Sequence, residues 1–373
     1  MRTTDITIDR HELGELAPLL LKVAGASLVI GLAGIAVMAT VGGRSLDRIL
    51  QSWLVGFAFF LTLSLGALFF VLLHHVTRAG WSVVLRRLAE GMAALFPLLA
   101  VFAIPIVLGL PHLYHWAEPG VVAHDPVLAG KAVWLDPTFF TVRLGVYLLV
   151  WSVLGIYLFS RSVRQDATGD PQLTITMEKR SAPGMLLFAL ALNFCAFDLL
   201  MSLDPHWFST IFGVYIFAGS VVVFYAVMPH LTHWLQHHKE LLHTVTVEHF
   251  HDLGKMLFAF VVFWAYIAFS QYMLIWYGNL PEETEWFLKR QTGQWTAFSL
   301  LLAFGHFVIP FLLLLPRSSK RKIHRLLLVS AWLVLMHWVD LYWIVMPEFS
   351  PGKVPLDPVD LFVMLTMAGA YGM

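Results

Sequence analysis

The sequence predicts an all-α integral membrane protein with about ten transmembrane helices, arranged as two parallel-repeat four-helix bundles plus flanking helices. Three observations predict this class: the composition, the spacing of the apolar segments and a duplicated acidic motif. Hydrophobic residues make up 58% of the 373 residues and charged residues only 13%, whereas soluble domains carry about 25% charged residues. This composition is typical of a chain that folds within a bilayer.

The apolar segments have the length that a bilayer requires. A hydrocarbon core of about 30 Å needs about 20 apolar residues per helix. Nine segments satisfy this requirement, at 16–41, 49–73, 91–110, 139–159, 184–203, 208–228, 256–277, 295–315 and 326–346. A tenth begins near Leu356 and is still apolar at Met373, so we expect a polar tail to follow it in the natural protein. Residues 1–15 lack the apolar stretch and cleavage site of a secretory signal.

Lysine and arginine are distributed unevenly between the loops on the two sides. The N-terminus and the loops after the second, fourth, sixth and eighth segments hold 16 basic residues, whereas the opposite loops hold six. Because cytoplasmic loops are enriched in lysine and arginine, both termini are predicted to be cytoplasmic. The opposite loops carry Asp-Pro pairs, which end helices and begin turns, at 125–126, 136–137, 204–205 and 357–358.

The residues present disfavour several cofactors. Cys195 is the only cysteine, so the chain alone cannot form a disulfide, a thiolate zinc site or a cysteine-ligated iron–sulfur cluster. No glycine-rich phosphate loop precedes a helix, and no nucleic-acid partner is expected. Haem bound by two histidines usually needs paired histidines on facing helices, but His306 and His337 each stand alone in their segments. We therefore expect no redox cofactor on this chain.

Two stretches on the predicted cytoplasmic side are amphipathic rather than apolar. One is 81–90, and the other is 230–251, which contains seven histidines. We interpret the second stretch as an interfacial helix that covers the bundle and exposes its histidines to water or headgroups. The alternative is a metal site, since histidine is the commonest metal ligand, but the spacings fit no tight ligand motif.

A short acidic motif occurs twice, 142 residues apart. Asp198 and Asp340 are each followed by Leu, five further residues and Pro, and each lies within an apolar segment. The repeat indicates an internal duplication. Four segments separate the copies, so the halves run in the same direction. We predict a first bundle at 49–207 and a second at 208–350, flanked by the N-terminal part at 1–48 and a last helix at 351–373.

A carboxylate inside a membrane is costly and suggests a functional site. Each of these two lies seven residues before its proline, which is about 10 Å along a helix and about two turns below the non-cytoplasmic surface. Asp198 has a candidate partner in Arg143, and the alternative to function is a buried ion pair that fixes helix packing. For Asp340 only His337 lies on the same face. An unpaired carboxyl in lipid favours its neutral form, which suits a proton relay.

Two further features have a structural and a functional interpretation. His306 is expected to make an ordinary hydrogen bond between helices, with ligand binding as the alternative. The seventh segment is dense in aromatic residues, which predicts packing against lipid with a belt at Trp276 and Tyr277. The alternative is a wall for a flat apolar ligand such as a quinone.

Long stretches of the chain resemble an integral membrane component of bacterial alternative complex III, a quinol:cytochrome c oxidoreductase. The resemblance is carried by residues 197–210, by 251–255 and by 269–283, which read FDLLMSLDPHWFST, HDLGK and FSQYMLIWYGNLPEE. It covers most of the chain from the second to the ninth segment. More distantly, the chain is similar to the NrfD family of polysulfide-reductase membrane subunits, whose members have two four-helix bundles.

The resemblance implies a non-catalytic or accessory membrane subunit of a respiratory complex that oxidises quinol, in the inner membrane of a bacterium. Haems and iron–sulfur clusters are then carried by other subunits. The implied partners are an NrfD-like membrane subunit, an iron–sulfur protein, a multihaem cytochrome c and lipids. A quinone or lipids are the only ligands expected on this chain. Asp198, Asp204, His206, Asp252 and Lys255 stand in the matching motifs.

The candidate residues fall into two groups. A proton path is predicted from a cytoplasmic entry toward the intramembrane carboxylates, through Glu248, Asp252, Lys255, Asp198, His337 and Asp340. A weaker quinone site is suggested by Asp204, His206, Gln271 and Tyr272. The competing interpretations are a secondary transporter, in which repeats and intramembrane carboxylates also occur, and a purely structural anchor.

Overall fold

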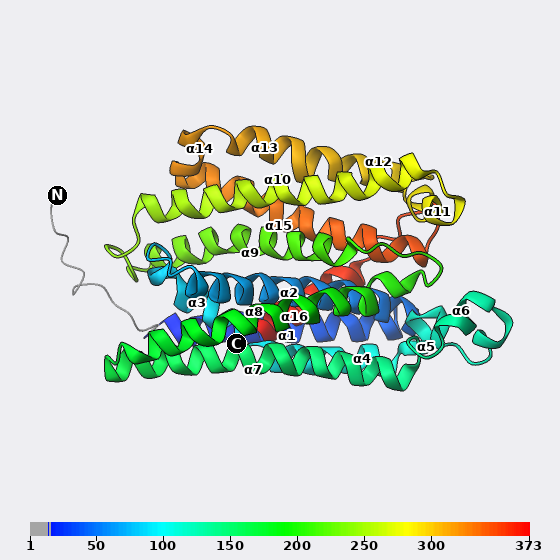
Figure 1. Cartoon of the computed structure of the whole chain (residues 1–373), viewed down its shortest axis with the longest axis horizontal. Coiled ribbons are helices and arrows are strands. Elements are labelled where there is room, and N and C mark those ends of the chain that lie inside the picture. The colour runs from blue at the N-terminus through cyan, green and yellow to red at the C-terminus, as the bar shows by residue number, and fades with distance from the viewer. Residues whose placement is uncertain (1–13, 15) are drawn as a thin grey trace.

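The computed structural model describes Gly14 and residues 16–373, and these residues form an all-α integral membrane protein. Nine helical spans among them are long and apolar enough to cross a bilayer, and a shorter apolar helix, α16 (Pro358–Tyr371), follows. The predicted fold class is therefore confirmed. Figure 1 shows the helices lying roughly parallel to one long axis.

The spans follow the predicted order with shifted ends. They are α1 (Leu16–Thr40), α2 (Leu46–Val76), α3 (Val83–Ala93) with α4 (Phe96–Leu108), α7 (Pro137–Thr168), α8 (Gln172–Leu199), α9 (Phe212–His237), α10 (Val247–Gly278), α12 (Trp295–Leu301) with α13 (Ile309–Leu314), and α15 (Ile323–Val345). Short helices α5 (Leu110–Leu113), α6 (Pro126–Lys131), α11 (Pro281–Arg290) and α14 (Arg317–Arg321) lie in the connections. The Asp-Pro pairs at 125–126 and 136–137 start helices, whereas they were expected to end helices and begin turns. The Asp125 and Asp136 side chains accept hydrogen bonds from the first backbone N–H groups of α6 and α7 and so cap these helices.

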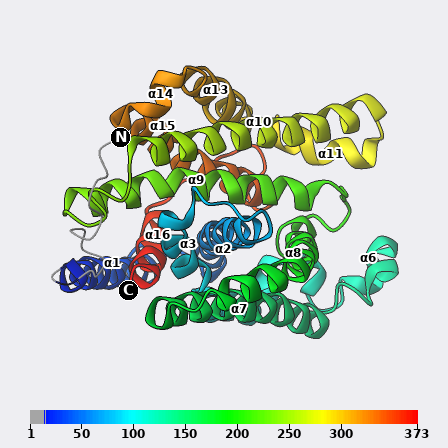
Figure 2. The same ribbon diagram turned by 60° about the vertical axis from the view of Figure 1, so that its left-hand side comes forward.

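Two helices form the centre of the molecule. In their most apolar stretches α2 is 94% buried and α9 is 83% buried, whereas α1 is only 11% buried. The two central helices pack directly on each other, and a side chain at Gly66 of α2 would collide with the carbonyl of Ser220 on α9. Helix α2 lies in the predicted first bundle and α9 in the predicted second, so this close approach is a contact between the two predicted bundles (Figure 2).

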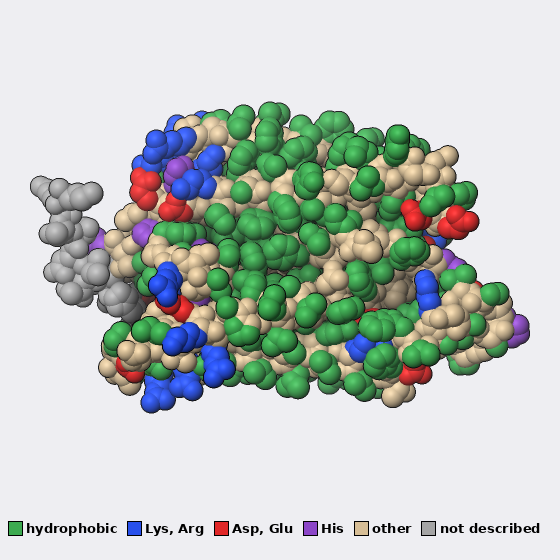
Figure 3. All heavy atoms as spheres, in the orientation of Figure 1, with side chains coloured by type: hydrophobic (Ala, Val, Ile, Leu, Met, Phe, Trp, Pro, Cys, Tyr) green, Lys and Arg blue, Asp and Glu red, His purple; other side chains and the backbone are tan. Residues whose placement is uncertain are grey.

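The surface has an apolar belt between two polar ends. Lys and Arg side chains gather at the end that carries α14 and the α7–α8 connection, and apolar side chains cover the middle (Figure 3). The α5, α6 and α11 segments lie at the opposite end. We call these the basic end and the α6 end. The belt is the surface expected of a protein in contact with lipid tails.

The histidine-rich stretch 230–251 is not an interfacial helix, contrary to the prediction. Helix α9 continues through Pro229 to His237, a non-helical connection follows, and α10 begins at Val247. The stretch is thus divided between the ends of two transmembrane helices. Pro229 is tolerated because neighbouring helices can compensate for a lost backbone bond in a transmembrane helix. The other amphipathic stretch, 81–90, forms the first part of α3, which leads into the third span.

Candidate functional site: two buried carboxylates

Asp198 forms the ion pair with Arg143 that the sequence predicts. The guanidinium of α7 donates two hydrogen bonds to this carboxylate of α8, at 2.7 Å from Nε and 3.0 Å from Nη2. Tyr147 Oη and Trp134 Nε1 donate at 2.9 and 2.8 Å. The guanidinium also lies over the Trp134 and Phe139 rings. The Asp198 side chain therefore accepts four charge-assisted or neutral hydrogen bonds and has the Arg143 guanidinium as its counter-ion.

Asp340 has a different environment, because no cation contacts it among the described residues. The carboxyl group is 2% exposed. It accepts a hydrogen bond from the Tyr215 hydroxyl of α9, and a second from Trp264 Nε1 of α10 at 3.1 Å. Both donors are neutral. Removing a carboxylate from water without a counter-ion disfavours its charged form, so this group can hold a proton without breaking an ion pair.

Two histidines lie near Asp340, each with incomplete hydrogen bonding. His337 Nε2 lies 2.8 Å from Thr62 Oγ1 on α2, while its Nδ1 has no hydrogen-bond partner within the described chain. His306 is fully buried, both its ring nitrogens lack partners there, and its ring stacks on Trp264 at 3.9 Å. The expected interhelical hydrogen bond of His306 is therefore wrong. His306 lies in a π-helical segment, Leu302–Val308, a feature often found at functional sites.

Helices α8 and α15, which carry the two copies of the acidic motif, are capped at their C-terminal ends by different buried side chains. Arg290 of α11 is fully buried and donates to the carbonyls of Trp343 and Ile344 at 3.1 and 2.6 Å. Burial lowers its pKa to about 10, partly offset by Glu348. At the end of α8, Tyr114 donates instead to the Leu199 carbonyl at 2.9 Å. These contacts satisfy carbonyl groups that a helix end leaves free.

Lys289 connects the two helix ends. Its ammonium lies 2.8 Å from Asp204, which follows α8, and 3.2 Å from Glu348, which follows α15. Burial alone would lower the pKa of Lys289, but the hydrogen bonds and charges of both carboxylates outweigh it and raise the pKa above its ordinary 10.5. The duplicated ends are thus tied together at the α6 end of the molecule.

We expect Lys289→Met to lower the free energy of unfolding by about 2 kcal/mol, because two carboxylates lose a charged donor. A raised folded-state pKa stabilises the protein fully below the unfolded pKa and loses this effect as pH rises through the folded pKa. The difference in melting temperature between wild type and variant should therefore be largest near neutral pH and decline above the ordinary lysine pKa of 10.5. If the difference in melting temperature stays constant as pH rises above 10.5, the Lys289 ammonium charge is not the source of the stabilisation.

The predicted cytoplasmic entry residues do not join the buried cluster. Asp252 pairs with Lys255 at 2.5 Å, and Glu248 pairs with Arg321 at 2.6 Å. Both carboxylates lie in the first turns of α10. Trp264, which reaches Asp340, lies twelve residues further along the same helix than Asp252, or about 18 Å. A continuous path through these three charged residues is therefore not formed by direct contacts between them and Asp340.

The four quinone-site candidates are also divided. Asp204 and His206 line an open hollow of about 380 Å³ at the α6 end, where His206 lies 2.6 Å from Asp125. Gln271 and Tyr272 do not line it. Gln271 accepts from Ser209 at 3.2 Å, and the Tyr272 ring stacks on Trp276 and contacts Phe287 edge-to-face. Of the four candidates, only Asp204 and His206 line the same hollow.

Sequence reasoning missed the neutral donors around both carboxylates. Tyr215 and Trp264, which donate to Asp340, and Thr62, which contacts His337, come from helices that are far from Asp340 along the chain, and only the tertiary fold brings them close. Trp264 is 4% exposed, so the expectation that the aromatic residues of this helix face lipid is wrong for this one. The sequence pattern does not distinguish Trp264 from the other aromatic residues of this segment, so its contact with Asp340 could not be predicted.

Neither the protein-family models nor the curated proteins compared with the chain give a match.

Proposed function

We propose that the chain is a membrane subunit of a respiratory quinol-oxidising complex of the alternative complex III type, in the inner membrane of a bacterium. In this proposal it carries no redox cofactor of its own, supports the membrane module and handles protons at Asp340. Both termini face the cytoplasm. The partners proposed are an NrfD-like membrane subunit, an iron–sulfur protein and a multihaem cytochrome c.

The observation that carries the proton role is the contrast between the two buried carboxylates. Asp198 is neutralised by Arg143 at 2.7 Å, whereas Asp340 contacts only the neutral donors Tyr215 and Trp264. A proton moving to or from Asp198 would break a buried ion pair. Asp340 can accept and release a proton with smaller cost, and the phenol of Tyr215 gives it a hydrogen-bonded neighbour that exchanges protons.

His337 and Thr62 extend this polar cluster toward the centre of the molecule. The 2.8 Å contact between them joins α15 to α2, the central helix of the first half. The Nδ1 atom of His337 has no partner among the described residues, and in this proposal a water bound there connects the His337–Thr62 contact with Asp340. In this proposal the second half provides the proton-handling group and the first half provides a fixed support.

Purification through a tag on this chain, from gently solubilised native membranes, tests the assembly. Co-purification with multihaem and iron–sulfur subunits, together with quinol oxidation by the purified assembly, supports the proposal. A haem-free homo-oligomer without partners would instead support the transporter interpretation. The optical spectrum of the purified sample, with and without dithionite, separates the two outcomes directly.

A further inference from the structure

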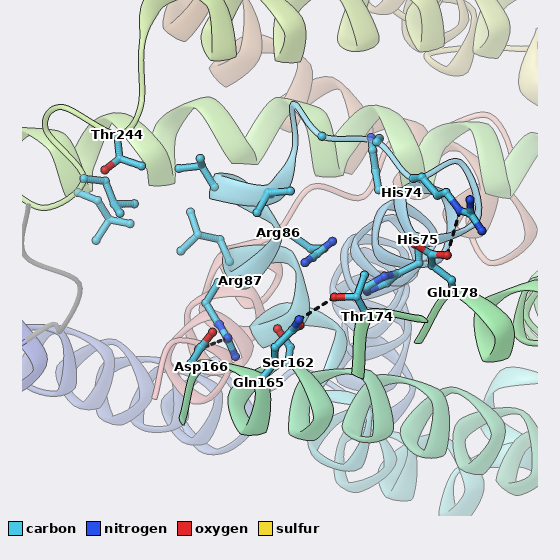
Figure 4. A pocket seen from close by; sticks show the side chains of 18 of the residues that line it. His74, His75, Arg86, Arg87, Ser162, Gln165, Asp166, Thr174, Glu178 and Thr244 are labelled. Atoms are coloured by element: carbon cyan, nitrogen blue, oxygen red, sulfur yellow. Dashed lines mark hydrogen bonds and ion pairs between the residues drawn. The ribbon is translucent and has the colours of Figure 1, made fainter. Parts of the chain in front are cut away.

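A cavity of about 1170 Å³ opens at the basic end, between the two halves of the chain. Its walls come from the end of α2, the start of α3, the adjacent parts of α7 and α8, and the loop after α9. Figure 4 shows His74, His75, Arg86 and Arg87 around it. All these segments lie at the ends of transmembrane spans, which is the level of lipid headgroups.

Charges of both signs line this cavity in near balance. Arg78 pairs with Glu178 at 2.9 Å, and Arg87 pairs with Asp166. Arg86 has only a longer contact, 3.4 Å from Glu90. A simple anion would meet these carboxylates as well as the arginines. The cavity therefore favours a ligand that itself carries both a positive and a negative group.

Two buried polar groups of the wall lack hydrogen-bond partners among the described residues. His75 is 1% exposed, and its Nε2 atom is unpaired. Glu240 is 6% exposed, and its Oε2 atom is unpaired. Both residues line the cavity. A buried polar atom without a partner loses its hydrogen bonds to water and gains none in return, so these atoms mark where a ligand gains hydrogen bonds.

The backbone around the cavity is strained. Arg78, Lys239 and Leu241 have positive φ angles of 52°, 66° and 54°. Non-glycine residues adopt this conformation at a cost and are found in it at ligand-binding segments.

The apolar side chains of Val83, Leu88 and Leu241 line the same cavity. A ligand with a charged head and an apolar body would use both kinds of wall.

We propose that this cavity binds the headgroup of a zwitterionic phospholipid with a primary ammonium, of the phosphatidylethanolamine type. The ammonium donates a hydrogen bond to Glu240 Oε2. The phosphate accepts hydrogen bonds from His75 Nε2 and Arg86. The glycerol and the upper acyl chains lie along Val83 and Leu88. The site does not depend on the proposed respiratory function.

Lipid retention by the purified protein tests this site. Wild type is reconstituted in nanodiscs that contain equal parts of phosphatidylethanolamine, phosphatidylcholine and phosphatidylglycerol, transferred to detergent and analysed by native mass spectrometry. We expect preferential retention of phosphatidylethanolamine. The trimethylated ammonium of phosphatidylcholine cannot donate a hydrogen bond to Glu240, and phosphatidylglycerol carries no cation. Equal retention of the three lipids would overturn the proposal.

Two variants and one control locate the binding. Glu240→Gln should lower the preference for phosphatidylethanolamine over phosphatidylcholine about tenfold, and His75→Phe should weaken retention of both lipids. Glu282→Gln, at the α6 end, should change neither. If Glu240→Gln fails to fold, competition decides instead. Retention of phosphatidylethanolamine against an excess of phosphatidylcholine supports the site, whereas its loss to that excess contradicts the site.

Discussion

Asp340→Asn is expected to lower proton translocation by the purified complex about a hundredfold, the scale of a lost acid–base group, while the complex still assembles. The amide has nearly the size of the carboxyl group, and its oxygen can accept from Trp264 while its NH2 group donates to the Tyr215 hydroxyl, which can also act as an acceptor. The amide cannot take up or release a proton. Because no cation depends on Asp340 among the described residues, the substitution leaves no buried charge unpaired. The measurement is proton release on quinol addition, in proteoliposomes with a pH-sensitive dye.

Two further variants distinguish a proton role from a packing role. Asp340→Glu retains a titratable group and should recover part of the lost translocation, although the longer side chain must fit a tightly packed site. Tyr215→Phe leaves the carboxyl group and removes one donor, so translocation should fall less than with Asp340→Asn. If Asp340→Asn translocates protons at the wild-type rate in an intact complex, Asp340 is structural. If all three variants fail to assemble, packing is again the better explanation.

Hydropathy alone was enough to predict the spans, because a bilayer constrains the length and composition of a helix more strongly than water does. The ends of the helices were less predictable. Helix α9 extends to His237 although Pro229 and several histidines interrupt its apolar pattern. A histidine can face either water or a neighbouring helix, and Ser330 of α15 contacts His230 at 3.1 Å. Composition does not distinguish these two environments.

The ion pair of the candidate site could be predicted from the sequence, because a charged side chain inside a membrane needs a counter-ion. Arg143 and Asp198 stand on adjacent helices at similar depth, so their pairing follows from orientation and the cost of isolated charges. The donors to Asp340 are neutral and lie 125 and 76 residues earlier in the chain. Tyrosine and tryptophan occur throughout the apolar segments, so residue type alone did not identify Tyr215 and Trp264 as the donors. Only the packing of α9 and α10 against α15 identifies them.

The second large effect is expected on the free energy of unfolding, when the ion pair of Asp198 is broken. Arg143→Met should destabilise the protein by about 3 to 5 kcal/mol, because Asp198 would remain buried without its counter-ion. Arg143 is 6% exposed and donates two hydrogen bonds to this carboxylate. Tyr147 and Trp134 alone cannot balance the charge. The expected measurement is a lower midpoint of unfolding in a mixed-micelle SDS titration, followed by circular dichroism.

A double variant separates the lost pair from lost packing. Arg143→Met combined with Asp198→Asn removes both charges, and the amide oxygen can still accept from Trp134 while its NH2 group donates to the Tyr147 hydroxyl. Replacing both members of a buried pair is often close to neutral, so the double variant should regain most of the stability lost in Arg143→Met. Arg164→Met, an exposed position on the same helix, serves as the control and should change little. If the double variant is as unstable as Arg143→Met, the guanidinium stabilises α7 mainly through its contacts with the Trp134 and Phe139 rings, and the ion pair contributes little.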